Sequence, residues 1–214
     1  MSGAKLSQAL KVRGARRASS LLVDATVDSK PQWRLEQAFG RFVEISGDGD
    51  SAALSVALGW VLAAQRLGEP VLWVAVENST YFPPDFAKSG VDLEALPTAL
   101  APDRDAAIRI ADLALRSGGL GVLFLDLTEV PSLPQSAQSR LAGLARQRNS
   151  ALVALTRKGL DAPSLGPLVS FRVTTRRRRT GVDHFLWEVE AVKDKRGQLG
   201  WQAQGARRGV DGLR

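Results

Sequence analysis

Continuous apolar runs alternate with segments of helical periodicity along the first three quarters of the chain. The apolar runs cover residues 42–45, 71–76, 120–127 and 151–155. Such runs are typical of strands buried on both faces of a parallel sheet. The segments between them predict helices over residues 52–67, 86–89, 103–116 and 136–147. This β-α alternation predicts an α/β fold with a mainly parallel sheet flanked by helices.

The helix expected over residues 103–116 follows a lead from residue 93 to 100. Asp103 or Asp105 can cap it. Its buried face is predicted to consist of Ala106, Ile110, Leu113 and Ala114.

Near the C-terminus the pattern changes to strict alternation. Residues 168–174, 185–192 and 199–204 alternate apolar and polar side chains, with turns expected at 180–181 and 195–197. Alternation with short turns predicts antiparallel strands at the edge of the sheet. The chain is therefore divided into a basic N-terminal arm (1–30), a core domain (31–204) and a disordered basic tail (205–214).

The turn-rich loop between the first strand and the first helix has the layout of a P-loop. That motif, G-x-x-x-x-G-K-[ST], wraps phosphates with backbone N–H groups and adds a lysine charge. Gly47 takes the first glycine position, but the second falls on Ala52, the lysine on Ala53 and the hydroxyl on Leu54. The loop (Gly47, Asp48, Gly49, Asp50, Ser51) also adds two carboxylates, which would repel a phosphate.

Several blocks of the sequence resemble the core of the RecA recombinase. These are GRFVEISG, AAQRLGEPVLWVAVEN, FAKSGVDLEAL and GVLFLDL, in that order, within a match from about Gly40 to about Leu199. With its degenerate P-loop and short length, the chain is similar to RecA-like accessory proteins of the ImuA type. The resemblance implies a role beside an ImuB-type polymerase-like subunit in error-prone translesion synthesis, within the SOS response to DNA damage.

The resemblance also assigns positions around the degenerate loop. Glu77 lies where RecA has its catalytic glutamate, and Asp126 lies on the strand of the Walker B aspartate. Arg157 replaces a glutamine that couples nucleotide to DNA in RecA. Without the P-loop lysine, both acids are interpreted as vestigial, and neither ATP hydrolysis nor a cofactor is expected. Weak nucleotide binding through the backbone of residues 47–51 stays open.

Composition restricts the classes of site. The chain of 214 residues has no cysteine and one histidine, which excludes disulfides and thiolate metal sites. No apolar run reaches the length of a membrane span, and no signal peptide is evident. A soluble protein of the bacterial cytoplasm, associated with the nucleoid, is expected. The net charge is +7, and both ends of the chain are basic around a mildly acidic middle.

The strongest charge signal is a run of four arginines between two predicted strands. It predicts sequence-independent contact with the phosphates of single-stranded or duplex DNA. The full predicted DNA-binding set is Arg176, Arg177, Arg178, Arg179, Lys193, Lys195, Arg196, Arg207 and Arg208. The alternative is a solvated turn that prevents edge-to-edge pairing of sheets. Phe185, Trp187 and Trp201 lie nearby in the sequence, and alternation places Trp187 in the core.

The N-terminal arm holds a short apolar stripe. Leu6 and Leu10 are spaced as on one face of a helix, which either docks on a protein partner or is part of a solvated tail. Trp33 is a candidate anchor for a partner. The partner is expected to be the ImuB-type subunit or RecA itself.

Two other functions stay open. One is a DNA-dependent ATPase with an unorthodox P-loop. The other is a protein–protein regulator, such as a SulA-like inhibitor of cell division.

Overall fold

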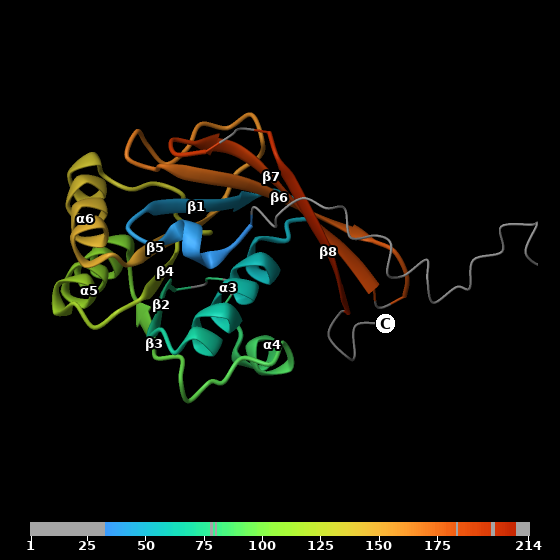
Figure 1. The fold of residues 1–214 in the computed structure, drawn as a ribbon, viewed down its shortest axis with the longest axis horizontal. Helices are drawn as coiled ribbons and strands as arrows, with labels where there is room; N and C mark the ends of the chain where they lie inside the picture. Colours follow the sequence, from blue (N-terminus) through green and yellow to red (C-terminus); the bar gives the residue numbers. More distant parts are fainter. Residues whose placement is uncertain (1–32, 78, 80, 183, 198–199, 209–214) are drawn as a thin grey trace, which may run out of the picture. The chain divides into compact units, whose positions relative to one another are not determined.

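The computed structural model describes residues 33–77, 79, 81–182, 184–197 and 200–208. Its eight strands form one sheet in the order β3-β2-β4-β5-β1-β6-β7-β8 (Figure 1). The strands are β1 Phe42–Gly47, β2 Val71–Val76, β3 Thr98–Ala101, β4 Val122–Asp126, β5 Ala151–Arg157, β6 Phe171–Arg179, β7 His184–Asp194 and β8 Gln202–Arg208. From β3 to β6 neighbouring strands are parallel, whereas β6, β7 and β8 are antiparallel. The predicted class is confirmed.

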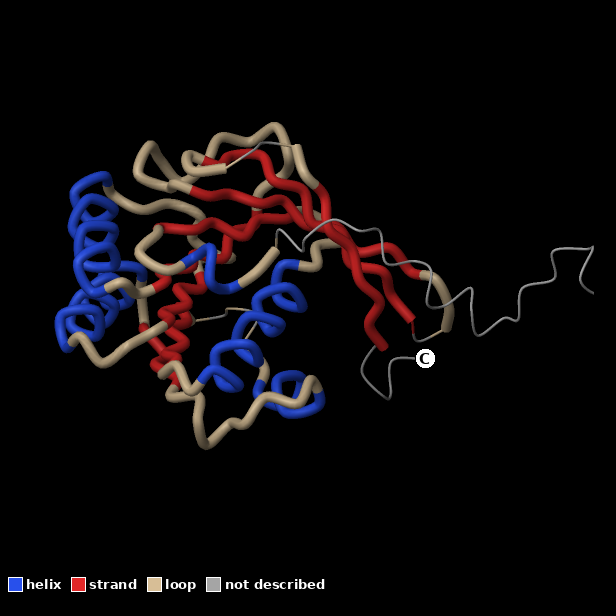
Figure 2. Tube along the Cα trace, in the orientation of Figure 1, coloured by secondary structure: helices blue, strands red, loops and turns tan. Residues whose placement is uncertain are grey.

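Helices cover both faces of the parallel part of the sheet. They are the short η1 Leu35–Ala38, and α3 Ala53–Leu67, α4 Pro83–Lys88, α5 Arg104–Ser117 and α6 Gln135–Arg148. The figures show α5 and α6 on one side, with α3 and α4 on the other (Figures 1 and 2). Among the described residues, no helix is both long and apolar enough to cross a lipid bilayer.

Local sequence signals set the helix ends. Asp103 is the N-cap of α5, and its carboxylate accepts a hydrogen bond of 2.7 Å from the Ala106 N–H. Gly68 ends α3 and Gly118 ends α5, both in the left-handed conformation that glycine adopts without a steric penalty. Leu113, predicted to be buried on α5, is 70% exposed, so that prediction was wrong.

Two apolar clusters form the core, one on each face of the sheet. The first packs α3 against the sheet and contains Trp73, which stacks on Phe124 with ring centroids 5.0 Å apart. The second lies under α5 and α6. Trp33 is half-buried and stacks on Trp60 at 4.1 Å, so it packs with the core instead of standing free as a partner anchor.

Three element boundaries differ from the predictions. The lead into α5 contains the edge strand β3, whose backbone pairs with Trp73 to Val76 of β2. A four-residue strand with one neighbour has too few apolar positions to be read from sequence alone. β6 continues through Arg179, so the arginines lie within a strand. β8 continues to Arg208, which places the predicted domain boundary at 204 inside a strand.

Strands β6, β7 and β8 continue past the parallel strands as a three-stranded antiparallel extension (Figures 1 and 2). We call the part of it formed by residues 175–179, 184–189 and 203–208 the wing. Its strands pair in register from Thr175 opposite Val189 to Arg179 opposite Phe185. β6 has the sequence pattern of a strand that leaves the core, because it becomes polar and exposed beyond Thr175.

Candidate phosphate loop and nucleic-acid interface

The loop after β1 occupies the position predicted for a P-loop, but its donors bond within the loop. The Gly49 N–H donates to Asp48 Oδ1 at 2.9 Å, and the Ser51 N–H donates to the Gly49 carbonyl at 2.8 Å. The Ala53 N–H, at the start of α3, donates to Ser51 Oγ at 3.0 Å. A P-loop binds phosphate through such N–H groups, so these three would have to break their bonds first.

The Ser51 side chain also fills the space above Gly47. A Cβ atom built at Gly47 would collide with Ser51 Oγ and Thr175 Oγ1. Those two hydroxyl groups lie 3.3 Å apart and join the loop to β6. Ala53 and Leu54 supply neither the ammonium nor the hydroxyl of the motif. Asp48 and Asp50 are exposed and add negative charge. The loop therefore has the shape of a strand-to-helix turn and lacks the electrostatics of a phosphate site.

The two acids assigned by resemblance lie in different environments. Glu77, at the end of β2, is exposed, and its N–H donates to the Ala101 carbonyl at 2.9 Å. Asp126, at the end of β4, is fully buried and accepts from the Thr128 N–H at 3.1 Å and the Thr128 hydroxyl at 2.7 Å. Burial raises the pKa of Asp126, although the bonds from Thr128 and the nearby Ser79 hydroxyl act against it.

Replacing Asp126 with asparagine is expected to remove a pH-dependent cost of folding. A carboxyl group whose pKa is raised on folding stabilises the folded state below its ordinary pKa of 3.8, and this stability is lost as pH rises through the folded pKa. As pH rises above about 4, the free energy of unfolding of the wild type should therefore fall relative to that of Asp126→Asn. Urea unfolding at several pH values measures the difference. A difference that stays constant from pH 4 to 8 contradicts the assignment.

The segment after β5 is held to the core by buried charges. Arg172 of β6 donates from Nε to Ser46 Oγ at 3.1 Å, and its other nitrogens bond to the Gly159 and Ala162 carbonyls. Glu44 of β1, fully buried, accepts from the Leu165 N–H at 2.9 Å. Arg172 Nε lies 3.8 Å from Glu44 Oε2. The segment after β5 is therefore bonded to the core from several sides.

Glu44 and Arg172 were not predicted as important, although the sequence held a signal. Each is a charged residue inside an otherwise apolar strand, FVEIS and FRV. A charge at such a position must find a partner, because burying it alone is costly. Arg157, the last residue of β5, instead forms an exposed ion pair with Glu129, with 2.8 Å between the charged atoms.

The predicted DNA-binding residues divide into two groups. Arg176 to Arg179 lie on β6 in the wing, and Arg207 and Arg208 lie on β8, opposite Phe185 and His184 of β7. Lys193, Lys195 and Arg196 lie at the other end of β7, where Lys193 pairs with Arg172. Arg178 lies six positions beyond Arg172 along β6, which is about 20 Å of strand. The structure does not bring the two groups together.

The second group is largely engaged within the protein. Lys193 Nζ donates to Ser164 Oγ at 3.2 Å and to the Gly166 carbonyl at 3.1 Å, and Lys195 Nζ donates to the Pro167 carbonyl. Burial lowers the pKa of Lys193, and the charge of Lys195 lowers it further. Arg196 is exposed in the following turn, with one nitrogen 3.4 Å from the Gly40 carbonyl. Leu6 and Leu10, the predicted partner-binding residues, lie outside the described residues.

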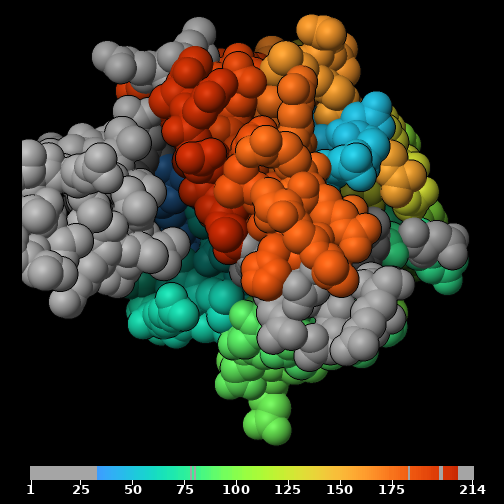
Figure 3. All heavy atoms as spheres, turned by 90° about the vertical axis from the view of Figure 1, so that its right-hand side faces the viewer, coloured from blue at the N-terminus to red at the C-terminus, as the bar shows by residue number. Residues whose placement is uncertain are grey.

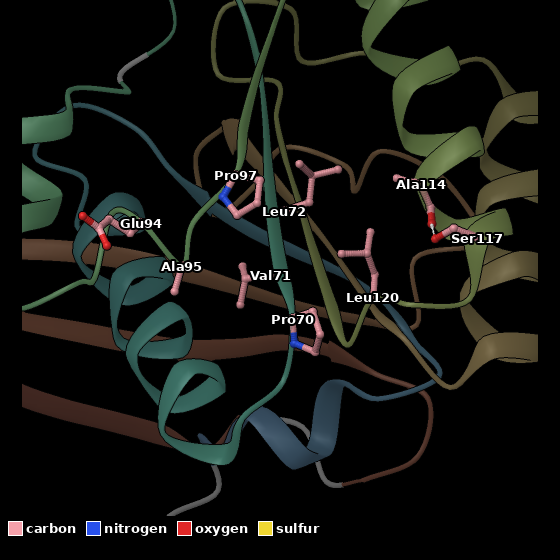
Figure 4. Close-up of a pocket in the computed structure, with 9 residues that line it drawn as sticks. All are labelled: Pro70, Val71, Leu72, Glu94, Ala95, Pro97, Ala114, Ser117 and Leu120. Carbon is pink, nitrogen blue, oxygen red and sulfur yellow. Dashed lines mark hydrogen bonds between the residues drawn. The ribbon is translucent and has the colours of Figure 1, made fainter.

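An apolar pocket lies where β2, β3 and β4 begin, and Figure 4 shows the residues that line it. Its volume is about 480 Å³, and its lining includes Pro70 and Val71 at the start of β2, Leu120 before β4, and Pro97 before β3. Glu94 is the one ionisable residue of the lining. The sequence blocks named above did not indicate this pocket, and none of the predicted site residues contributes to it.

Comparison with known proteins relates part of the chain to RecA. No protein-family model matches the chain. RecA of Nocardioides sp. is 40% identical over 88 residues, which are 41% of this chain and 25% of that protein. RecA of Saccharopolyspora erythraea is 36% identical and RecA of Kineococcus radiotolerans 38% identical over the same length. The chain thus matches about a quarter of the length of these relatives. Together with the sheet order, the comparisons support a RecA-like relationship for this part of the protein.

Proposed function

We propose that the protein is a non-catalytic, RecA-like accessory protein of the DNA damage response that binds DNA without hydrolysing ATP. The observation that carries the proposal is the loop after β1. It stands where a RecA-like core would hold nucleotide, but Ala53 and Leu54 replace the two side chains that the chemistry needs. Three of its N–H groups are bonded within the loop. DNA binding then has no nucleotide switch to depend on.

The basic wing supports the DNA-binding part of the proposal. Four consecutive arginines are exposed there on β6. Exposed guanidinium groups bind phosphates in any sequence context. The sequence identity to RecA supports a role in DNA repair. The resemblance to ImuA-type proteins narrows that role to translesion synthesis. The partners would be an ImuB-type polymerase-like subunit or RecA, in error-prone translesion synthesis at the nucleoid.

Steady-state ATPase assays test the absence of catalysis. We expect no turnover above background with or without single-stranded DNA, because no lysine stabilises the charge that develops on the transferred phosphoryl group. The variant Glu77→Gln serves as the control. It should behave like the wild type, since a vestigial glutamate contributes nothing to turnover. DNA-stimulated turnover that Glu77→Gln abolishes would instead establish the enzyme alternative.

Fluorescence anisotropy with labelled DNA tests the binding. We expect salt-sensitive binding that is the same with and without ATP and magnesium. Binding that requires ATP would overturn the interpretation of the loop. An absence of binding at low salt would overturn the DNA-binding proposal and favour a protein–protein regulator of the SulA type.

A further inference from the structure

The arginines of the wing are divided between the two faces of the sheet. Side chains alternate along a strand, and directly paired residues of antiparallel strands share a face. Arg177 is opposite Trp187 and Arg179 is opposite Phe185, so these four residues share one face. We call it the aromatic face. Arg176 is opposite Glu188, and Arg178 shares their face. We call this the mixed face.

On the mixed face the positive charge has a counter-charge within the protein. Glu188 lies directly across from Arg176, and Glu190 follows two residues along the same strand and face. Opposite charges in such cross-strand pairs attract each other. A phosphate that approached Arg176 would also meet these carboxylates. The mixed face therefore offers little net positive potential to a polyanion.

On the aromatic face one arginine, Arg177, lies beside a ring. The Arg177 guanidinium carbon lies 5.0 Å from the centroid of the Phe185 ring, within the range of a cation–π contact. The Arg177 side chain is still 46% exposed. Trp187 lies over Gly205 of β8, where a Cβ atom would collide with the indole. The absence of a side chain at Gly205 leaves room for the indole, which is half-buried and also packs against the first apolar cluster.

The acid beside Arg177, Asp50, would compete only weakly with a phosphate for the guanidinium. Asp50 Oδ1 is 4.0 Å from the Arg177 guanidinium, but the Asp50 side chain is 88% exposed. Water screens such a pair, so it holds the guanidinium loosely. The Arg177 backbone N–H also donates to the Asp50 carbonyl, and this bond fixes the loop beside β6. In Figure 3 the cyan loop lies next to the orange atoms of this region.

We propose that the aromatic face of the wing is a binding surface for single-stranded DNA, an inference that rests on the proposed function. Arg177 and Arg179 would contact phosphates, and unpaired bases would stack on Phe185 and Trp187. Surfaces that bind single strands combine a basic track with aromatic side chains, because unpaired bases expose their π faces. Duplex DNA hides those faces, so it would gain only the phosphate contacts.

A matched pair of single variants tests the assignment of the face. Arg177→Ala and Arg176→Ala each remove one exposed charge from neighbouring positions of the same strand. Arg179 is not used, because its guanidinium bonds to the Gly181 and Val182 carbonyls and supports the turn. The probes are a labelled 20-nucleotide oligothymidine and a 20-base-pair duplex. Arg177→Ala should weaken oligothymidine binding about fivefold to tenfold, and Arg176→Ala less than about twofold.

A third variant, Phe185→Leu, separates stacking from charge. It keeps an apolar side chain but removes the ring, so it should weaken oligothymidine binding several-fold and leave duplex binding unchanged. Thermal unfolding must show that each variant is folded. Equal losses of oligothymidine affinity for Arg176→Ala and Arg177→Ala, or an unchanged affinity of Phe185→Leu, would contradict the aromatic face as the binding surface. The proposal that the protein binds DNA would not be affected. Failure of the wild type to bind either probe would instead refute the proposed function.

Discussion

Replacing Arg172 with methionine is expected to lower the free energy of unfolding by about 3–5 kcal/mol, because it removes one of the two cations beside the buried Glu44 carboxylate. Glu44 is fully buried, with Arg172 3.8 Å and Lys158 3.6 Å from its carboxylate oxygens. Arg172 also donates to carbonyls at both ends of the segment 159–162. A domain of this size has about 5–15 kcal/mol of stability in total, so the loss is large.

Urea unfolding followed by tryptophan fluorescence measures this effect. Arg178→Met, on the same strand but exposed, is the matched control and should change stability by less than about 0.5 kcal/mol. The double variant Glu44→Met, Arg172→Met should recover part of the loss, since it removes both charges together. Equal stability of Arg172→Met and Arg178→Met would show that the buried pair does not hold the segment after β5.

Replacing all four arginines, Arg176 to Arg179, with alanine is expected to weaken single-stranded DNA binding by at least about tenfold at 0.15 M salt. The charges are exposed and lie outside the core, so the fold should survive. The slope of log affinity against log salt should fall by about 0.7 for each arginine that contacts a phosphate of a single strand. Anisotropy titrations at several salt concentrations give both quantities.

Lysine substitution at the same four positions is the control for this variant. It keeps the charge and should retain most of the salt-dependent binding, although it loses the guanidinium stacking on Phe185. The companion variant Lys193→Ala, Lys195→Ala should affect DNA affinity little, because both ammonium groups already bond to the segment 164–167. A folded alanine variant with wild-type affinity would show that the wing is not part of the DNA-binding surface.

The apolar runs were enough to predict the parallel sheet, because a strand buried on both faces is apolar at most of its positions. β1, β2, β4 and β5 were found this way. β3 was not, since a short edge strand needs little apolar surface. The arginine run was interpreted as a turn, because four adjacent charges do not fit a buried strand. The wing resolves this, since a strand with both faces exposed can hold them.

The candidate site was only partly predictable. The missing lysine and hydroxyl at Ala53 and Leu54 are visible in the sequence, as are the acids of the loop. The bond that joins the loop to β6 connects Ser51 and Thr175, which are far apart in the chain and meet where β1 and β6 pair. Spacing alone carries no information about such contacts.

The sequence by itself determined the α/β class, because this class depends on local periodicity, and it shows which side chains the loop after β1 carries. The tertiary structure decided which charges act together. It separated Lys193 and Lys195 from the arginines, paired Glu44 with Arg172, and placed Arg177 beside Phe185 and Arg176 opposite Glu188. The physical reason is that strand register, which long-range pairing sets, determines which face and which neighbour each side chain receives.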